Sequence, residues 1–191
     1  MLCLQSRTES AWLQRAVAHT ADILIDHAHC ERKAATNALQ ILGRFPDRPE
    51  LVAPLLALAR EELEHFEVVL ALLHTRGIAL GSQVPSGYQA KLHQLMRRDA
   101  PHKLLDVLLV AALIEARSCE RFKILAAHHP DGELRQAFAS LLEAEARHHA
   151  TFVRLAELVA PREEVRSRLS ALAQAECAIL EAMPAVARIH A

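Results

Sequence analysis

Four long stretches of this chain repeat apolar residues every three or four positions, and each stretch contains glutamate near its middle. This spacing places the apolar residues on one face of a helix, which can then pack against other helices. The interrupting residues are Glu31, then Glu62 with His65, then Glu115, and finally Glu145 with His148. Because an unpaired buried carboxylate is costly, we expect these four helices to bring their glutamates together.

The same arrangement occurs twice along the chain. Glu62 follows Glu31 by 31 residues (from 31 to 62), and Glu145 follows Glu115 by 30 residues (from 115 to 145). The second glutamate of each pair begins a Glu-x-x-His motif, which places both side chains on one helix face, one turn apart. A single motif of this kind is an ordinary chance occurrence. Its recurrence in matching register indicates two similar halves, which four unrelated glutamates at helix edges would not explain.

The composition is typical of an all-α fold. Only 5 of the 191 residues are glycine and 4% are aromatic, which disfavours a β-sandwich or a β-barrel. The hydrophobic content of 52% is enough for a core, and the length suits a single domain over residues 1–191. Proline and glycine positions predict helices over residues 10–19, 20–44, 49–76, 88–98, 101–129 and 131–160, with a last helix running toward the C-terminus after residue 161.

Packed antiparallel, the four long helices would place four carboxylates and two imidazoles at one level of a bundle. This is the ligand set of ferritin-like di-iron carboxylate proteins. The sequence therefore predicts a ferritin-like antiparallel four-helix bundle with additional N- and C-terminal helices and two bound Fe ions. The six predicted metal ligands are Glu31, Glu62, His65, Glu115, Glu145 and His148. Oxygen and imidazole ligands suit iron or manganese, and the other ten of the 12 histidines are interpreted as non-ligands.

Charge and hydropathy limit the partners and the location. With 22 Lys+Arg against 23 Asp+Glu, the chain is neither a globally basic nucleic-acid binder nor the carrier of a polybasic membrane anchor. The longest apolar run, residues 51–59, is far shorter than the roughly 20 residues that span a bilayer. The chain shows no secretory signal and no CxxC pair, so we expect a cytoplasmic protein without membrane contact.

Particular residues disfavour several kinds of di-iron protein. Iron-storage ferritins usually keep one Glu-x-x-His motif, whereas this chain has two. A radical generator would need tyrosine about one turn after His65, where the chain has Val69, and no CxxC rubredoxin module is present. The remaining interpretation is substrate oxidation with O2 as co-substrate and electrons from an external donor. Two alternatives stay open: a di-iron hydroxylase or oxidase of a small molecule, and a non-catalytic iron-handling protein.

Four segments around the predicted ligands carry a family resemblance. They are residues 29–35 (HCERKAA), 62–66 (ELEHF), 114–122 (IEARSCERF) and 143–149 (EAEARHH). These segments resemble the tRNA 2-methylthio-N6-isopentenyladenosine hydroxylase (MiaE) family, and the similarity extends over roughly residues 10–190.

The MiaE resemblance implies a di-iron monooxygenase that hydroxylates the isopentenyl group of 2-methylthio-N6-isopentenyladenosine in tRNA. It also implies an external electron donor of the reductase or ferredoxin type. The family's metal ligands carry over onto the same six residues, and no further catalytic residue is implied.

A tRNA substrate requires basic residues that contact phosphates. The candidates are Arg32 and Lys33 beside a predicted ligand, and a cluster of Lys91, Arg97, Arg98, His102 and Lys103. The alternative is that these residues lie on solvated helix surfaces.

Overall fold

The computed structural model describes residues 2–82 and 84–190, and the regular structure in these ranges is helical throughout. The elements are α1 (Ser10–Ala18), α2 (Thr20–Arg44), the 3-10 turn η1 (Pro49–Leu51), α3 (Val52–Thr75), α4 (Tyr88–Gln94), α5 (His102–His128), α6 (Gly132–Val159) and α7 (Arg162–Glu181). The all-α prediction is therefore confirmed. No helix among the described residues combines the length and the apolar character needed to cross a membrane.

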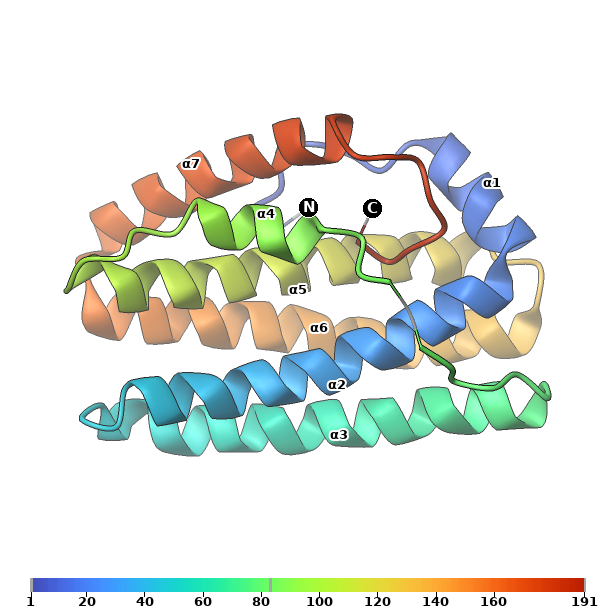
Figure 1. Cartoon of the computed structure of the whole chain (residues 1–191), viewed down its shortest axis with the longest axis horizontal. Coiled ribbons are helices and arrows are strands. Elements are labelled where there is room, and N and C mark those ends of the chain that lie inside the picture. Colours follow the sequence, from blue (N-terminus) through green and yellow to red (C-terminus); the bar gives the residue numbers. More distant parts are fainter. Residues whose placement is uncertain (1, 83, 191) are drawn as a thin grey trace.

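Local sequence explains where the long helices begin and end. Phe45-Pro46 ends α2, and Gly77, with a positive φ of 65°, follows the end of α3. The Asp131 side chain caps α6 by accepting hydrogen bonds from the backbone N–H groups of Glu133 and Leu134. These short reversals make α2 antiparallel to α3 and α5 antiparallel to α6, whereas the connection from α3 to α5 runs back along the bundle (Figure 1).

The two helix pairs form the bundle, and the remaining helices cover one side of it. α4 and α7 lie over α5, and α1 packs near the start of α2 (Figure 1). Residues 104–113 of α5 are consequently all buried, whereas α2 alternates buried and exposed positions. α5 is therefore the central helix of the molecule.

Apolar residues form two clusters at opposite ends of the bundle. One cluster contains Leu55 and Leu58 of α3 with Phe152 of α6, and the other contains Val69 of α3 with Phe138 of α6. Burial of each such side chain stabilises the fold by about 1.5–3 kcal/mol. The predicted glutamates and histidines lie on these helices between the two clusters, as their place within each apolar stripe predicts.

Two boundaries differ from the expectation. α4 ends at Gln94 rather than near residue 98. α7 ends at Glu181, and the chain then turns back toward α1 and α5 instead of continuing as a helix (Figure 1). Ile189 and His190 in this returning segment are buried, with exposed fractions of 0% and 4%. Long-range contacts rather than helical periodicity determine the path of this segment.

Candidate metal centre

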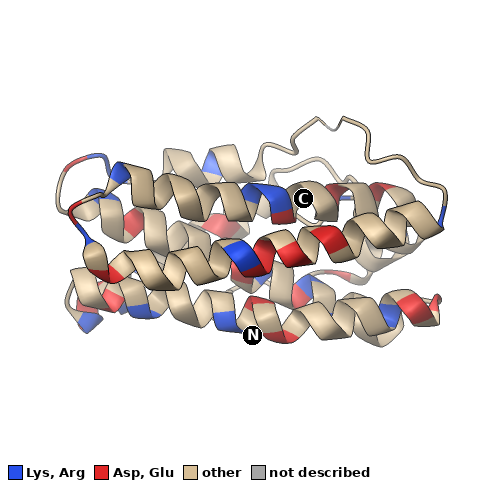
Figure 2. Ribbon diagram, turned by 90° about the horizontal axis from the view of Figure 1, so that it is seen from below, with Lys and Arg blue, Asp and Glu red and all other residues tan. Residues whose placement is uncertain are grey.

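The structure brings all six predicted ligands to the middle of the bundle. Each long helix contributes at its mid-length, and every one of these side chains is buried. The residues are Glu31 from α2, Glu62 and His65 from α3, Glu115 from α5, and Glu145 and His148 from α6. In Figure 2, acidic residues gather near the middle of the bundle.

The six side chains form two overlapping groups. The first group is Glu31, Glu62, His65 and Glu145, and the second is Glu62, Glu115, Glu145 and His148. Within each group the potential ligand atoms all lie within 4.8 Å of one another. Glu62 and Glu145 belong to both groups, which is the arrangement expected of carboxylates shared between two ions.

Several polar atoms in the centre have no hydrogen-bond partner among the described residues, although they are buried. They include both Glu62 carboxylate oxygens, Glu145 Oε1, His65 Nδ1 and His148 Nδ1. His148 Nδ1 and Glu62 Oε1 approach to 2.7 Å, yet without hydrogen-bond geometry. Buried polar atoms normally have partners, so atoms that converge without bonding each other indicate a common ligand. This oxygen and imidazole donor set fits a pair of divalent cations.

Electrostatic repulsion among the carboxylates favours the same interpretation. Burial, together with the negative charge of Glu62, raises the pKa of Glu115 to about 8. Burial and the neighbouring carboxylates, first of all Glu115, raise the pKa of Glu145 well above its ordinary value. Negative charge is thus destabilised at these positions, and bound divalent cations would compensate it.

Two further residues contact the predicted ligands directly. His27 Nε2 lies 2.5 Å from Glu31 Oε1, and the His27 ring packs against Phe122 and Phe138. Burial alone would raise the pKa of Glu31, but the adjacent His27 imidazole lowers it below its ordinary value. On the other side of the centre, Glu61 Oε2 lies 3.0 Å from His148 Nε2. Residues in such positions orient metal ligands.

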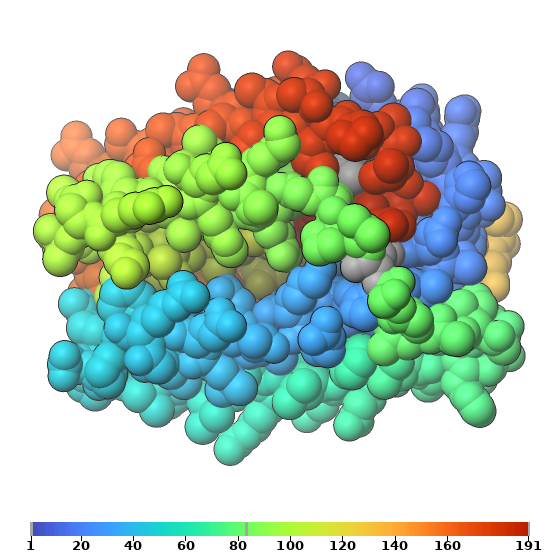
Figure 3. All heavy atoms as spheres, in the orientation of Figure 1, coloured from blue at the N-terminus to red at the C-terminus, as the bar shows by residue number. Residues whose placement is uncertain are grey.

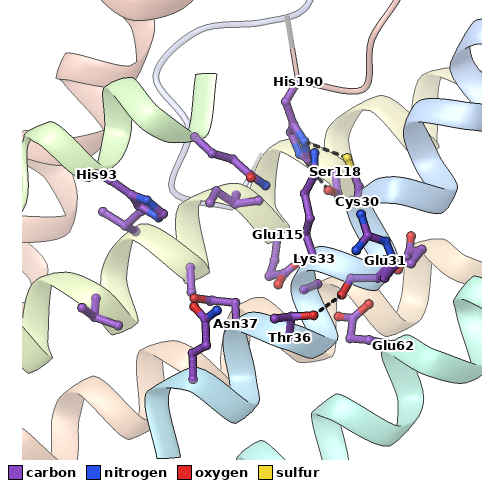
Figure 4. Close-up of a pocket in the computed structure, with 18 of the residues that line it drawn as sticks. Cys30, Glu31, Lys33, Thr36, Asn37, Glu62, His93, Glu115, Ser118 and His190 are labelled. Atoms are coloured by element: carbon purple, nitrogen blue, oxygen red, sulfur yellow. Dashed lines mark hydrogen bonds between the residues drawn. The ribbon is translucent and has the colours of Figure 1, made fainter. Parts of the chain in front are cut away.

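A cavity of about 290 Å³ reaches the centre from the side of α2 and α5. Glu31, Glu62, Glu115 and Glu145 lie at its inner end, whereas His65 and His148 do not line it. Figure 4 shows Glu31, Glu62 and Glu115 directed toward one another at this end. In the space-filling view, α5 is visible between α2 and α4 (Figure 3). A reactant in the cavity therefore meets the carboxylates first.

The cavity has two chemically different walls. One wall is apolar and consists of Val107, Val110, Ala111 and Ile114 of α5, together with Met96. The polar and basic part of the lining comes from α2 and α4, and its members include Arg32, Lys33, Asn37, Gln40, Arg44, Gln89 and His93. Among the described residues that line the cavity, the acidic ones are the four glutamates of the centre. A ligand with an apolar end and a polar, anionic end matches this arrangement.

Comparison with known proteins agrees with the resemblance seen in the sequence. The family described as "tRNA-(MS[2]IO[6]A)-hydroxylase (MiaE)" matches residues 1–191, the whole chain. The chain belongs to the MiaE family.

The individual relatives of this MiaE family member are named for two different activities. The tRNA 2-(methylsulfanyl)-N(6)-isopentenyladenosine(37) hydroxylase of Pseudomonas putida is 37% identical over 96% of this chain and 89% of its own length. The hydroxylase of the same name from Salmonella typhimurium is 32% identical over 74% of this chain, which spans about half (52%) of its length. A solved structure, "Protein 43 with aldehyde deformylating oxygenase activity from Synechococcus", is 46% identical with a TM-score of 0.96, covering 100% of this chain and 96% of that one.

Not every basic residue considered for phosphate binding in this MiaE family member faces the cavity. Arg97 donates hydrogen bonds from its backbone N–H and its guanidinium to the buried Asp106 carboxylate, and His102 contacts Asp99. These two side chains therefore hold the start of α5. Arg32 and Lys33 do line the cavity, and so does Arg44, for which no sequence pattern predicts a role.

The sequence patterns also predict no role for His27, Glu61 or His190. A signal existed for His27, because it lies one helical turn before Glu31 and must share its face. No comparable local signal existed for Glu61 and His190, since their contacts come from distant parts of the chain.

Proposed function

We propose that this protein hydroxylates the isopentenyl group of 2-methylthio-N6-isopentenyladenosine in tRNA, in the cytoplasm, with two Fe ions and O2. The observation that carries the proposal is a buried centre of four carboxylates and two imidazoles at the end of a half-apolar, half-basic cavity. The tRNA hydroxylase names of the Pseudomonas and Salmonella relatives support the choice of substrate.

The six predicted ligands would hold the iron. Glu31 and His65 would bind one ion, Glu115 and His148 the other, and Glu62 and Glu145 would be shared. When bound, the iron pair supplies O2 reduction: one oxygen atom enters the substrate C–H bond as a hydroxyl, and the other leaves as water, with two electrons and two protons from an external donor. The chain's task is to fix the ligands and leave the cavity side open.

The cavity walls orient the substrate in this proposal. Val110, Ala111 and Ile114 contact the isopentenyl group and keep water away from the reacting carbon. Asn37 and Gln89, which also line the cavity, offer amide groups to the adenine edge, and a basic side chain such as Arg44 pairs with a phosphate. The volume of about 290 Å³ lies at the small end of ligand pockets, roughly 300–1,000 Å³, and admits one modified base rather than a folded strand.

The direct test is hydroxylation in vitro. Purified protein loaded with Fe(II) is incubated with tRNA carrying the isopentenyl modification, O2 and a chemical reductant, and the nucleosides are analysed by mass spectrometry. We expect the mass of one added oxygen on the modified adenosine. Glu115→Ala should abolish the product, whereas Glu143→Ala, at an exposed position of α6, should retain it. Unchanged tRNA after incubation with iron-loaded wild-type protein would refute the proposal.

The name of the Synechococcus structure favours a second candidate, oxidation of a free aldehyde. Such a substrate needs the apolar wall but has no use for Arg32, Lys33 and Arg44. Incubation of the iron-loaded protein with apolar aldehydes in the absence of tRNA distinguishes the two functions. Rapid aldehyde consumption that added tRNA does not inhibit would favour this candidate over the tRNA hydroxylase.

A further inference from the structure

The segment that follows α7 folds back and forms hydrogen bonds with three other parts of the molecule. The Trp12 indole N–H donates to the Arg188 carbonyl at 3.0 Å, and the Ile189 N–H donates to Asp26 at 2.6 Å. The Ser86 hydroxyl donates to the His190 carbonyl at 2.9 Å. These bonds reach α1, α2 and the loop before α4, so the segment has a defined position although it is not helical.

The His190 side chain of this segment lies inside the protein, with an exposed fraction of 4%. Its ring lies parallel to that of Tyr88, at 5.2 Å between centroids and an interplanar angle of 6°. Its Nε2 lies 3.0 Å from the Ser118 hydroxyl and its Nδ1 lies 3.6 Å from the Cys30 sulfur. One arrangement satisfies both contacts: Nε2–H donates to the Ser118 hydroxyl oxygen, and the Cys30 thiol donates to Nδ1.

The position of these contacts relates His190 to the carboxylate centre. Cys30 directly precedes Glu31 on α2, and Ser118 lies one turn after Glu115 on α5. The ring therefore bridges the two helices that carry the lone glutamates, at the level of the centre. Cys30, Ser118 and His190 all line the cavity, and Figure 4 shows them together beside the carboxylates.

The uncharged imidazole of His190 can bridge Ser118 and Cys30. Burial, and then the positive charges of Arg121 and Arg117, lower the pKa of His190 to about 3. A neutral ring has one donor and one acceptor nitrogen, which matches the two partners. His190 thus keeps this bonding pattern across the physiological pH range.

We propose that His190 is a positioning residue that forms the inner side wall of the cavity and excludes bulky groups from the carboxylate centre. It joins α2 to α5 beside Glu31 and Glu115, so the open route to the centre is the one lined by α2, α4 and α5. Its effect on the choice of substrate rests on the proposed function, but its closure of the cavity does not.

The test measures access to Cys30, which lies in the cavity against His190. Wild type, His190→Ala and the matched control Val186→Ala, an exposed position of the same segment, are treated separately with a small methanethiosulfonate and with a bulky maleimide. Peptide mass spectrometry gives the rate at each cysteine, so Cys3, Cys119 and Cys177 report general loosening. No iron, O2 or tRNA is needed.

We expect His190→Ala to speed bulky labelling of Cys30 about tenfold or more, because a hydrogen bond and a ring contact that hold the wall closed are lost. Labelling by the small reagent should change by less than about threefold, since that reagent already enters through the open route. Val186→Ala should match wild type. If His190→Ala loses helix content, His190→Asn replaces it, because asparagine keeps a hydrogen-bond donor on a shorter side chain. His190→Asn should speed labelling of Cys30 by the bulky reagent about threefold, without a comparable effect on the small reagent.

An unchanged bulky-reagent rate in these variants would overturn the proposal. Equal acceleration of both reagents at all cysteines would also overturn it, because that pattern indicates a loosened fold. A second readout uses the enzyme: His190→Ala should raise KM for modified tRNA about tenfold while kcat changes less than about threefold. Failure of wild type to hydroxylate tRNA would refute the proposed function, whereas the labelling result would still decide the role of His190.

Discussion

The α2–α3 pair and the α5–α6 pair present the same residues in the same register, yet different neighbours surround them. Glu31 has His27 one turn earlier, at 2.5 Å, whereas the position one turn before Glu115 is Ala111, which lines the cavity. The pKa of Glu31 is accordingly lowered, while that of Glu115 is raised to about 8 by burial and then by Glu62. A neighbouring imidazole thus favours the charged form of Glu31, whereas the surroundings of Glu115 disfavour its charged form, which a cation in the proposed metal centre would compensate.

The histidines show the opposite asymmetry. His148 is supported by Glu61 at 3.0 Å, whereas the equivalent position before Glu145 is Ala144, which offers no carboxylate to His65. Each half therefore supplies one predicted ligand that contacts an orienting neighbour, Glu31 or His148, and one that does not, His65 or Glu115. Repetition of a ligand motif does not make two metal positions equivalent, because the surrounding side chains determine how firmly each ligand is held.

The largest expected effect comes from Glu62 and Glu145, the two glutamates that belong to both groups of predicted ligands. Glu62→Ala or Glu145→Ala should remove both ions and reduce hydroxylation below detection, because each residue belongs to both groups. Glu31→Ala should instead weaken only the ion near His65. Metal analysis after desalting, with circular dichroism to verify folding, measures the difference. Retention of one ion by Glu62→Ala would contradict the shared role and make the halves independent.

The second prediction compares a buried ion pair between α5 and α7 with an ion pair near the surface of the α2–α3 half. α5 lies beneath α7, where Arg117 and Glu176 form an ion pair with both side chains 0% exposed. Glu176→Ala removes one of the two carboxylates that pair with the buried Arg117, Glu120 being the other. It should cost about 3 kcal/mol of unfolding free energy, measured by urea denaturation, which is the lower end of the range for breaking a buried ion pair. In the other half, Arg48→Ala breaks a solvent-accessible pair with Glu50 and should leave the free energy of unfolding nearly unchanged. If Glu176→Ala lowered the free energy of unfolding as little as Arg48→Ala does, α7 would contribute little to the stability of α5.

The third effect addresses the histidines. Glu61→Ala should weaken metal binding at the position of His148 about 10–100-fold, as loss of an orienting carboxylate typically does. The position of His65 should be unaffected. Titration of the metal-free protein with Co(II), whose absorption reports coordination, separates the two affinities. Glu64→Ala, exposed on the same helix, serves as the control. A uniform decrease at both positions would show that Glu61 acts through the bundle rather than through His148.

The sequence alone predicts much of this comparison, but not its asymmetry. Register along each helix is a local property, so the mid-length positions of Glu31, Glu62, Glu115 and Glu145 follow from spacing. The contact of Glu61 with His148 depends on how α3 meets α6, and helical periodicity does not specify that rotation. The return of His190 to Cys30 spans 160 residues and depends on the Asp26, Ser86 and Trp12 contacts. Such contacts arise from the assembled fold rather than from any local pattern.

The smallest effect concerns basic residues that distinguish the outer surfaces of the two halves. Arg44 on α2 lines the cavity, whereas Arg154 on α6 lies outside it. If tRNA approaches over the cavity, Arg44→Ala should weaken tRNA binding a few-fold and reduce the slope of log K against log salt by about 1, because one phosphate contact is lost.

Arg154→Ala removes the same charge from the opposite half and should leave both the affinity and the slope unchanged. Fluorescence anisotropy with labelled tRNA at several salt concentrations measures both quantities. The slope is the more informative of the two, because it reports phosphate contacts made by Arg44 separately from recognition of the base in the cavity. Equal slopes for the two variants would mean that the backbone of the tRNA does not follow the α2 side, and the basic wall would then serve the modified base alone.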